Sequence, residues 1–236
     1  MTAASVANRS DQTIVVVLAD IAPVSRLWGW ARIVKGPQSL LALDGVRFAK
    51  VLGSGYEGGF GLRPSSSRHG LFLVFHTALA ARDFLAHSEL MQSYRERARE
   101  LCLLTLRTWS CRGSWDGTAL DLATEPPAGG PIAALTRASI QVRKASAFWN
   151  HAPPSQAALA GVPGIQLAVG LGEAPFLRQA TFTVWDSVQH MDAYARSGAH
   201  LEAIKAAAEH QYFSESMFAR FVPVSIEGRW KDRSYG

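Results

Sequence analysis

Two stretches of sequence decide the fold: FLVFHTALAARDFLAHSEL at residues 72–90 and FTVWDSVQHMDAYARSGAH at residues 182–200. The second aligns with the first at a constant offset. Each copy contains an alternating strand, then a Thr or Ser that opens a helix, then an aromatic residue on the helix face. The chain therefore looks like a duplicated supersecondary unit. The aligned pairs are Phe72 with Phe182, Val74 with Val184, Phe75 with Trp185, Phe84 with Tyr194 and Leu90 with His200.

Apolar periodicity around these stretches predicts the same order of elements twice. In the first half we expect strands at 13–19, 46–52, 71–75 and 103–111, with helices at 25–34 and 78–100. In the second half we expect strands at 134–142, 165–169, 179–185 and 216–226, with helices at 145–159 and 187–208. A break at Gly198 in the last helix, and an edge or bend at Pro223, fit this pattern. Strand, helix, strand, strand, helix, strand is the ferredoxin-like unit.

The predicted fold class is therefore α+β, with tandem ferredoxin-like units forming an intrachain pseudo-dimeric α+β barrel. The Pro- and Gly-rich segment ATEPPAGGP at 123–131 reads as a linker. It separates an N-terminal unit, residues 1–122, from a C-terminal unit, residues 132–236. The alternative is two unrelated α+β lobes.

Composition limits the classes of function. A chain of 236 residues that is 48% hydrophobic can bury a substantial core, so disorder is not expected. The formal charge of +5 comes with no helix-turn-helix, zinc-finger or aromatic-basic signature, so we predict no nucleic-acid partner. Cys102 and Cys111 are too few for a disulfide scaffold. With no apolar signal segment, we expect a cytoplasmic protein that meets the inner membrane, if at all, peripherally.

One glycine motif resembles a nucleotide site but lacks the required context. Residues 53–58 match GxGxxG after a predicted strand, yet residues 59–64 continue as loop where a dinucleotide site needs a helix. We interpret this segment as a flexible bend or a lid. Arg63 beside it is a candidate contact for an anionic group of a cofactor. No GxSxG, Walker or HExxH motif is present.

The histidines favour a cofactor that needs only one protein ligand. Seven histidines are scattered along the chain, and their spacings suggest no zinc triad. Haem iron needs a single imidazole, because the porphyrin supplies four nitrogens. His200 fits best, near one border of the sheet-facing side of its helix, although a surface or helix-end histidine is the alternative. Trp185 and Tyr194 either shape a pocket there or are ordinary core.

Several blocks of sequence resemble the spheroidene monooxygenase family of carotenoid biosynthesis. The similarity runs from about residue 13 to residue 221. The blocks are GSGYEGGFGLRP, CRGSWDG, GPIAALTRASI, GLGEAPFLRQATFTVWDSVQHMDAYARSGAHLEAI and FSESMFARF. The resemblance implies a dimeric α+β barrel that depends on haem and inserts oxygen from dioxygen into an acyclic carotenoid, giving a ketone.

The resemblance also implies roles for particular residues. His200 becomes the proximal ligand to the iron of haem b, and Arg137 and Arg178 become candidates for distal or propionate contacts; exposed arginines on outer strands are the alternative. We expect as partners an apolar small-molecule substrate, dioxygen and an external electron donor such as a ferredoxin or reductase, because no flavin or iron–sulfur motif is evident. Two other functions remain open: a haem enzyme of aldoxime dehydratase type, and a non-enzymatic haem-binding protein.

Overall fold

The computed structural model describes residues 9–61, 63–149, 159, 161–174 and 176–236. In the helix at 198–209 the description leaves out the side chains of Ala199, His200, Ala203, Ile204 and Ala208. The first half contains β1 (Thr13–Ile21), η1 (Pro23–Ser25), α1 (Arg26–Lys35), α2 (Gln38–Leu41), β2 (Val46–Gly55), η2 (Tyr56–Gly58), β3 (Pro64–Phe75), α3 (Ala78–His87), α4 (Glu89–Arg97) and β4 (Ala98–Gly113).

The second half repeats this order. It contains β5 (Ile132–Ile140), η3 (Val142–Lys144), β6 (Ile165–Ala174), β7 (Arg178–Trp185), α6 (Val188–Ala195), α7 (Gly198–Glu209), β8 (Phe213–Trp230) and β9 (Arg233–Tyr235). Residues 145–149 are helical, and most of the helix predicted at 145–159 lies outside the described residues.

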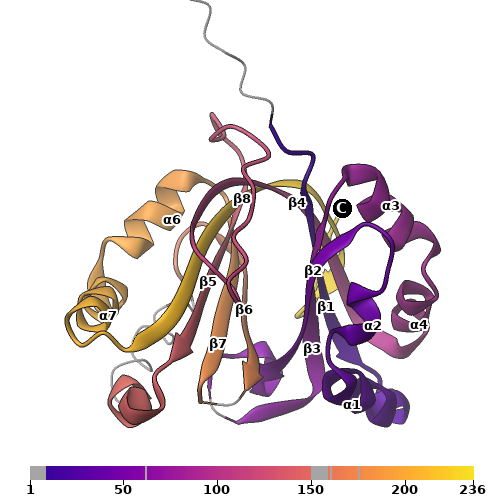
Figure 1. The fold of residues 1–236 in the computed structure, drawn as a ribbon, viewed down its shortest axis with the longest axis horizontal. Coiled ribbons are helices and arrows are strands. Elements are labelled where there is room, and N and C mark those ends of the chain that lie inside the picture. Colours follow the sequence, from indigo (N-terminus) through magenta and orange to yellow (C-terminus); the bar gives the residue numbers. More distant parts are fainter. Residues whose placement is uncertain (1–8, 62, 150–158, 160, 175) are drawn as a thin grey trace, which may run out of the picture.

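Eight antiparallel strands close into a barrel. The strand order is β4-β1-β3-β2-β6-β7-β5-β8, β8 pairs back onto β4, and β9 adds a short hairpin to β8. Each half has the ferredoxin-like strand order, and the halves join through the equivalent pairs β2–β6 and β4–β8. Helices α1 to α4 cover one flank and α6 and α7 cover the opposite flank (Figure 1). The predicted α+β barrel built from two ferredoxin-like units is confirmed.

The duplication extends to individual side chains. The Thr77 hydroxyl accepts from the Ala80 N–H at the start of α3, and the Ser187 hydroxyl accepts from the His190 N–H at the start of α6. The aromatic pairs also recur. The Phe75 and Phe84 ring centroids are 5.3 Å apart, and those of Trp185 and Tyr194 are 5.4 Å apart. Both pairs pack a helix onto the outer face of its sheet.

Alternate residues of all eight barrel strands form one apolar core inside the barrel. It combines Ile14, Phe72 and Leu104 of the first half with Phe182 and Phe221 of the second. The intervening residues of the first half point outward and form a second core beneath α1 to α4. Because side chains of both halves fill the interior, the two halves share one hydrophobic core. The predicted boundaries 1–122, 123–131 and 132–236 stay a prediction.

Some predicted boundaries differ from those observed. Strand β3 begins at Pro64, within the predicted glycine-rich loop. The helix predicted at 78–100 is two helices, because Ser88 is extended and its hydroxyl accepts from the Met91 N–H to start α4. The last helix breaks just before Gly198, as expected. A register shift beside Pro223 supplies the expected bend in β8.

The glycine motif brings three segments of backbone together. After β2 the chain forms η2, and the Gly59 carbonyl lies against Gly170 on the outer face of β6. The Ser54 hydroxyl donates to the Gly170 carbonyl at 2.7 Å. The loop therefore crosses from the first half onto the second. No helix begins at Gly58, in agreement with the rejection of a dinucleotide site.

Gly170→Ala tests this close approach. A Cβ at Gly170 would lie 2.4 Å from the Gly59 carbonyl oxygen, so the loop must shift. We expect a loss of about 1–3 kcal/mol of unfolding free energy, measured by urea denaturation. Gly129→Ala is the control, because a Cβ there meets nothing within 4 Å. Equal midpoints for the two variants would contradict the predicted clash.

Candidate functional site

The two halves differ on the sheet surface that faces their helices. Thr13 pairs with Phe75 in the first half and Ile132 pairs with Trp185 in the second, which defines equivalent positions. At these positions the large aliphatic residues of the first half are replaced by smaller or hydroxylated ones. We call the second set the C-terminal helix-facing surface. The replacements are Val15 by Ala134, Val17 by Thr136, Val51 by Gly170, Leu71 by Thr181, Leu73 by Thr183 and Leu101 by Ser216.

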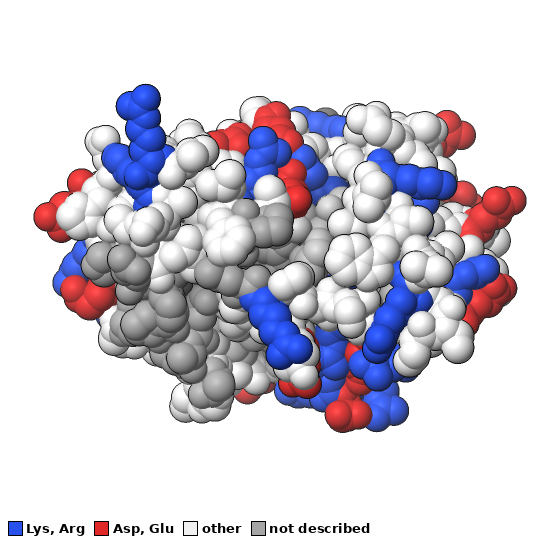
Figure 2. Space-filling view, turned by 90° about the horizontal axis from the view of Figure 1, so that it is seen from below, with Lys and Arg blue, Asp and Glu red and all other residues white. Residues whose placement is uncertain are grey.

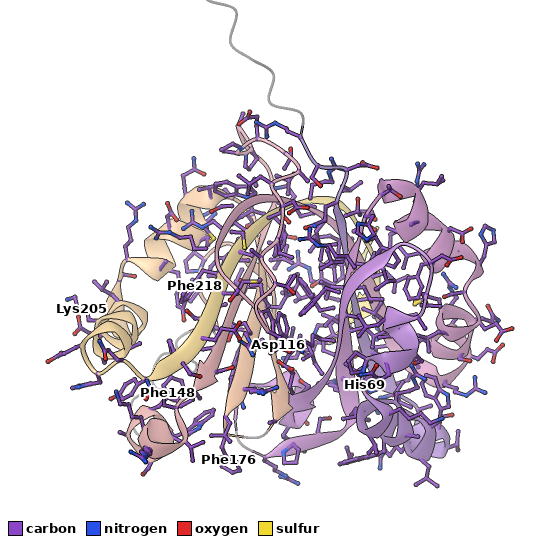
Figure 3. The ribbon with its side chains drawn as sticks, viewed as in Figure 1. His69, Asp116, Phe148, Phe176, Lys205 and Phe218 are labelled. Atoms are coloured by element: carbon purple, nitrogen blue, oxygen red, sulfur yellow. The ribbon has the colours of Figure 1, made fainter. Side chains whose placement is uncertain are left out.

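Solvent exposure follows the same difference. Val17 and Leu71 are 0% exposed beneath the first set of helices. The equivalent Thr136 is exposed and Thr181 is half-buried, although both lie on central strands. Phe218, on the neighbouring strand β8, is 42% exposed (Figure 3). Buried aliphatic side chains cover the first helix-facing surface, whereas the C-terminal one is accessible to solvent at Thr136, Thr181 and Phe218, with Gly170 and Thr183 buried beside them.

Aromatic and apolar residues border this surface. Trp185 is buried and donates through its indole N–H to the Thr183 hydroxyl at 2.8 Å. Tyr194 of α6 stacks obliquely on it, and Phe60 of the glycine loop packs against the same cluster. Burial raises the pKa of Tyr194 to about 12, so its hydroxyl stays protonated at neutral pH. The predicted pair Trp185 and Tyr194 thus lies beside the C-terminal helix-facing surface.

Helix α7 covers the same flank and carries His200 in its first turn (Figure 1). The His200 side chain lies outside the described residues. Its role as axial ligand therefore stays a prediction.

The three predicted arginines lie in different surroundings. Arg63 is exposed, and its guanidinium lies 4.2 Å from the Tyr56 ring centroid. Arg178 begins β7, is 49% exposed, and has a nitrogen 3.6 Å from a Glu173 carboxylate oxygen. Arg137 is 1% exposed and points into the barrel, on the face of the sheet opposite α7. The roles predicted for these arginines stay predictions.

Arg137 belongs to a charge cluster at one mouth of the barrel. Its guanidinium donates to Glu215 and has a nitrogen 3.5 Å from Glu173. Lys50 donates to Glu173 at 2.9 Å and is also paired with Asp116. Figure 3 shows Asp116 inside the barrel. The cluster comprises Lys50, Asp116, Arg137, Glu173, Arg178 and Glu215, so positive and negative charges balance.

Hydrogen bonds hold Glu215 of this cluster in its charged form. Desolvation opposes ionisation of Glu215, but the Gly117 N–H, the Ser114 hydroxyl and the Arg137 guanidinium together lower its pKa to about 2. The Trp115 indole N–H donates to Glu173 at 2.7 Å. The Arg137 Nε and Nη2 atoms are buried without a hydrogen-bond partner among the described residues. This cluster was not predicted from the sequence. The available signal was the alternation of inward and outward residues, which places Glu173 and Glu215 on the inward face of their strands.

His69 has a structural environment in the first half. It is buried, and its Nε2 atom lies 2.8 Å from the Tyr94 hydroxyl (Figure 3). Burial lowers the pKa of His69 to about 4, so the ring is neutral at physiological pH. Within the described part of the chain, no three His, Cys, Asp or Glu residues are grouped to hold a metal ion.

A closed barrel built from two fused ferredoxin-like units is the architecture of the dimeric α+β barrel class. A crystal structure of aldoxime dehydratase in complex with butyraldoxime has the same fold, with a TM-score of 0.58 and 10% identity over 91% of this chain and 81% of that one. A second aldoxime dehydratase structure also has a TM-score of 0.58, with 13% identity over 90% of this chain and 81% of that one.

Sequence comparison identifies the family. The chain is 59% identical to a spheroidene monooxygenase of Rubrivivax gelatinosus over 94% of this chain and 86% of that protein. It is 36% identical to one of Rhodobacter capsulatus over 78% of each. No family model matches the sequence. The chain belongs to the spheroidene monooxygenase family. Monooxygenases are oxidoreductases.

Glu215→Gln tests the charge cluster. A carboxylate whose pKa is lowered from 4.5 to about 2 by folding stabilises the protein above about pH 4.5. That contribution disappears as the pH falls from 4.5 towards 2. We expect the variant to lose on the order of a few kcal/mol of unfolding free energy at pH 7, and the difference from wild type to shrink below pH 4.5.

The measurement is urea denaturation at several pH values. Glu202→Gln is the control, because this carboxylate is 70% exposed and its pair with Lys205 contributes little. A Glu215→Gln deficit that is the same at every pH would contradict the assignment.

Proposed function

We propose that this chain is a haem-dependent monooxygenase that inserts oxygen from dioxygen into an acyclic carotenoid, or a similar apolar substrate, and forms a keto product. Membership of the spheroidene monooxygenase family supports carotenoid oxygenation. We further propose haem b as the cofactor and an external electron donor, such as a ferredoxin or reductase. The haem proposal has its own support in the contrast between the two helix-facing surfaces.

That contrast fits a flat, largely apolar group between sheet and helices. In the first half, aliphatic side chains fill this layer and leave no room. In the second half, Ala134, Thr136 and Thr181 present short side chains on central strands and retain solvent exposure. Cores are otherwise packed to high density, so an open face on a central strand favours a ligand.

We propose that His200 would hold the haem iron, because α7 covers this flank of the barrel and His200 is in its first turn (Figure 1). Trp185 and Tyr194 would form one wall, and Phe60 a second. Arg63 is a candidate to pair with a propionate, since it is exposed and a guanidinium binds a carboxylate well. Arg178 shares the inward side of β7 with Ala180 and Phe182 and is already paired with Glu173, so we propose an indirect role for it. For Arg137 we propose an indirect role, because its charge is already paired inside the barrel.

Haem, when bound, supplies the chemistry that activates dioxygen. The chain contributes binding, orientation and exclusion of water. An apolar carotenoid end gains about 0.8 kcal/mol for each methylene removed from water, so apolar walls favour its entry. The protonated Tyr194 hydroxyl and the hydroxyls of Thr136 and Thr181 are donors that can orient polar atoms of ligands.

His200→Ala tests the ligand assignment. We expect the purified wild type, reconstituted with haem, to show a Soret band, and the variant to lose that band or shift it strongly. His87→Ala is the matched control, because His87 is an exposed helical histidine paired only with Asp83 among the described residues. An unchanged Soret band in His200→Ala would remove His200 from the axial position.

Pigment analysis in a host that makes acyclic carotenoids tests the reaction. We expect a keto carotenoid with the wild type and none with His200→Ala. Haem-loaded protein that leaves the pigment unaltered, with a working electron donor, would contradict the monooxygenase assignment. Turnover of an aldoxime without dioxygen would instead favour a dehydratase, and weakly held haem without any product would favour a carrier.

Thr136→Leu/Thr181→Leu tests the location of the haem. These changes restore the bulk that Val17 and Leu71 provide in the first half. The leucines would occupy space that the haem needs. We expect at least about a tenfold loss of haem affinity by spectroscopic titration, since a penalty of about 1.4 kcal/mol changes an equilibrium constant tenfold. Thr136→Ser/Thr181→Ser is the control and should bind like the wild type. If the leucine variant binds haem normally, the site lies elsewhere.

A further inference from the structure

The surface of α1 carries apolar side chains that the fold leaves uncovered. Val24 of η1 is 95% exposed, and Leu27, Trp30 and Val34 of α1 are 88%, 46% and 82% exposed. Leu27, Trp30 and Val34 have helical spacing and share one face. The opposite face packs Trp28 and Ile33 onto the core. The helix therefore has an internal apolar face and an external one.

Basic residues alone accompany this external face. Residues 21–43 contain three cations, Arg26, Arg32 and Lys35, and no acidic residue. Arg26 and Lys35 are exposed. Scattered exposed apolar residues are ordinary, but a stripe of them flanked only by cations is typical of a segment that lies on an anionic lipid surface.

The same end of the barrel presents similar residues from the second half. Strands β1, β2, β5 and β6 all finish at this end, which we call the lower end and which lies at the bottom of Figure 1. Phe176, after the end of β6, is 48% exposed there (Figure 3). Val142 of η3, directly after β5, is 75% exposed and is followed in sequence by Arg143 and Lys144. Figure 2 views this end and shows uncharged surface interspersed with Lys and Arg side chains, with Asp and Glu side chains mostly around its rim.

We propose that the α1 surface, formed by Val24, Leu27, Trp30 and Val34 with Arg26 and Lys35, docks the protein on an anionic lipid bilayer. A second copy of the chain fits this surface less well. A twofold contact through α1 would place its cations against their own copies, with no acidic residue between 21 and 43 to pair them. Lipid phosphates supply the missing negative charge, and the acyl region takes the apolar stripe.

Docking at this surface goes beyond the proposed function. Only the reason for docking rests on that function, since a carotenoid substrate would be dissolved in the bilayer. The described helices include none that is long and apolar enough to cross a membrane. Surface contact through α1 would bring the protein to a substrate dissolved in the bilayer.

Vesicle flotation tests the proposal with the whole purified chain and no carotenoid. The probes are vesicles of phosphatidylcholine alone and vesicles that also contain phosphatidylglycerol. We expect binding to the anionic vesicles that weakens as salt is raised. Leu27→Glu/Val34→Glu should reduce that binding at least about tenfold, because apolar burial and charge attraction are both lost.

Leu79→Glu/Leu122→Glu is the matched control. These leucines are 70% and 52% exposed, outside the α1 surface, so the change in charge is the same. The control should bind like the wild type. Arg26→Gln/Lys35→Gln, which leaves the apolar stripe in place, should lower binding to anionic vesicles only.

Three results would overturn the proposal. The first is no vesicle binding by the wild type. The second is an equal loss of vesicle binding in Leu27→Glu/Val34→Glu and Leu79→Glu/Leu122→Glu. The third is a dimer, detected by light scattering, that only Leu27→Glu/Val34→Glu dissociates while its vesicle binding persists. Vesicle binding requires neither haem nor turnover. Its failure is therefore distinguishable from failure of the proposed function, which the Soret band and the pigment analysis report.

Discussion

Barrel closure depends on two seams between the halves, and the short seam is the critical constraint. β4 and β8 pair over most of their length, whereas the β2–β6 register contains only Gly53 with Gly172 and Ser54 with Leu171. Glycines let the backbones of β2, β6 and the following loop approach closely. The Ser54 hydroxyl adds a side-chain bond across the seam. Without this closure, β2 and β6 would expose unpaired edges and the shared core would open to water.

Closure also determines where a ligand can bind. Apolar side chains fill the middle of the barrel, and the charge cluster occupies its lower mouth. Arg137 at 1% exposure is paired with carboxylates on other strands and in the β4–β5 connection. Such a cluster contributes little net stability, but removing one partner leaves a buried charge uncompensated. The interior is therefore filled, and the C-terminal helix-facing surface is where we propose that the ligand binds.

Sequence periodicity predicted the strands, the duplication and the fold class, because each depends on local alternation. It missed the start of β3 because residues 64–69 are polar, although they pair with β1 and with the glycine-rich end of β2. Apolar periodicity also ran through Ser88, although a serine followed by Glu89 is a typical start of a new helix. For the charge cluster, alternation could have placed Glu173 and Glu215 on the inward faces of their strands, but their meeting with Lys50 depends on barrel closure, which the sequence pattern does not show. The open helix-facing surface becomes visible only once pairing defines which residues of the halves correspond.

The unequal helix-facing surfaces have a consequence for how such barrels diverge. When two separate single-unit chains form a barrel, both sheets carry the same side chains, so any residue removed to make room weakens both copies. Fusion into one chain removes this symmetry. One half can keep Val17 and Leu71 and serve as a rigid anchor, while the other gives up that packing for Thr136 and Thr181. Tandem duplication thus permits one half to stay tightly packed while the other leaves space beneath its helices. A homodimer of identical halves cannot combine the two.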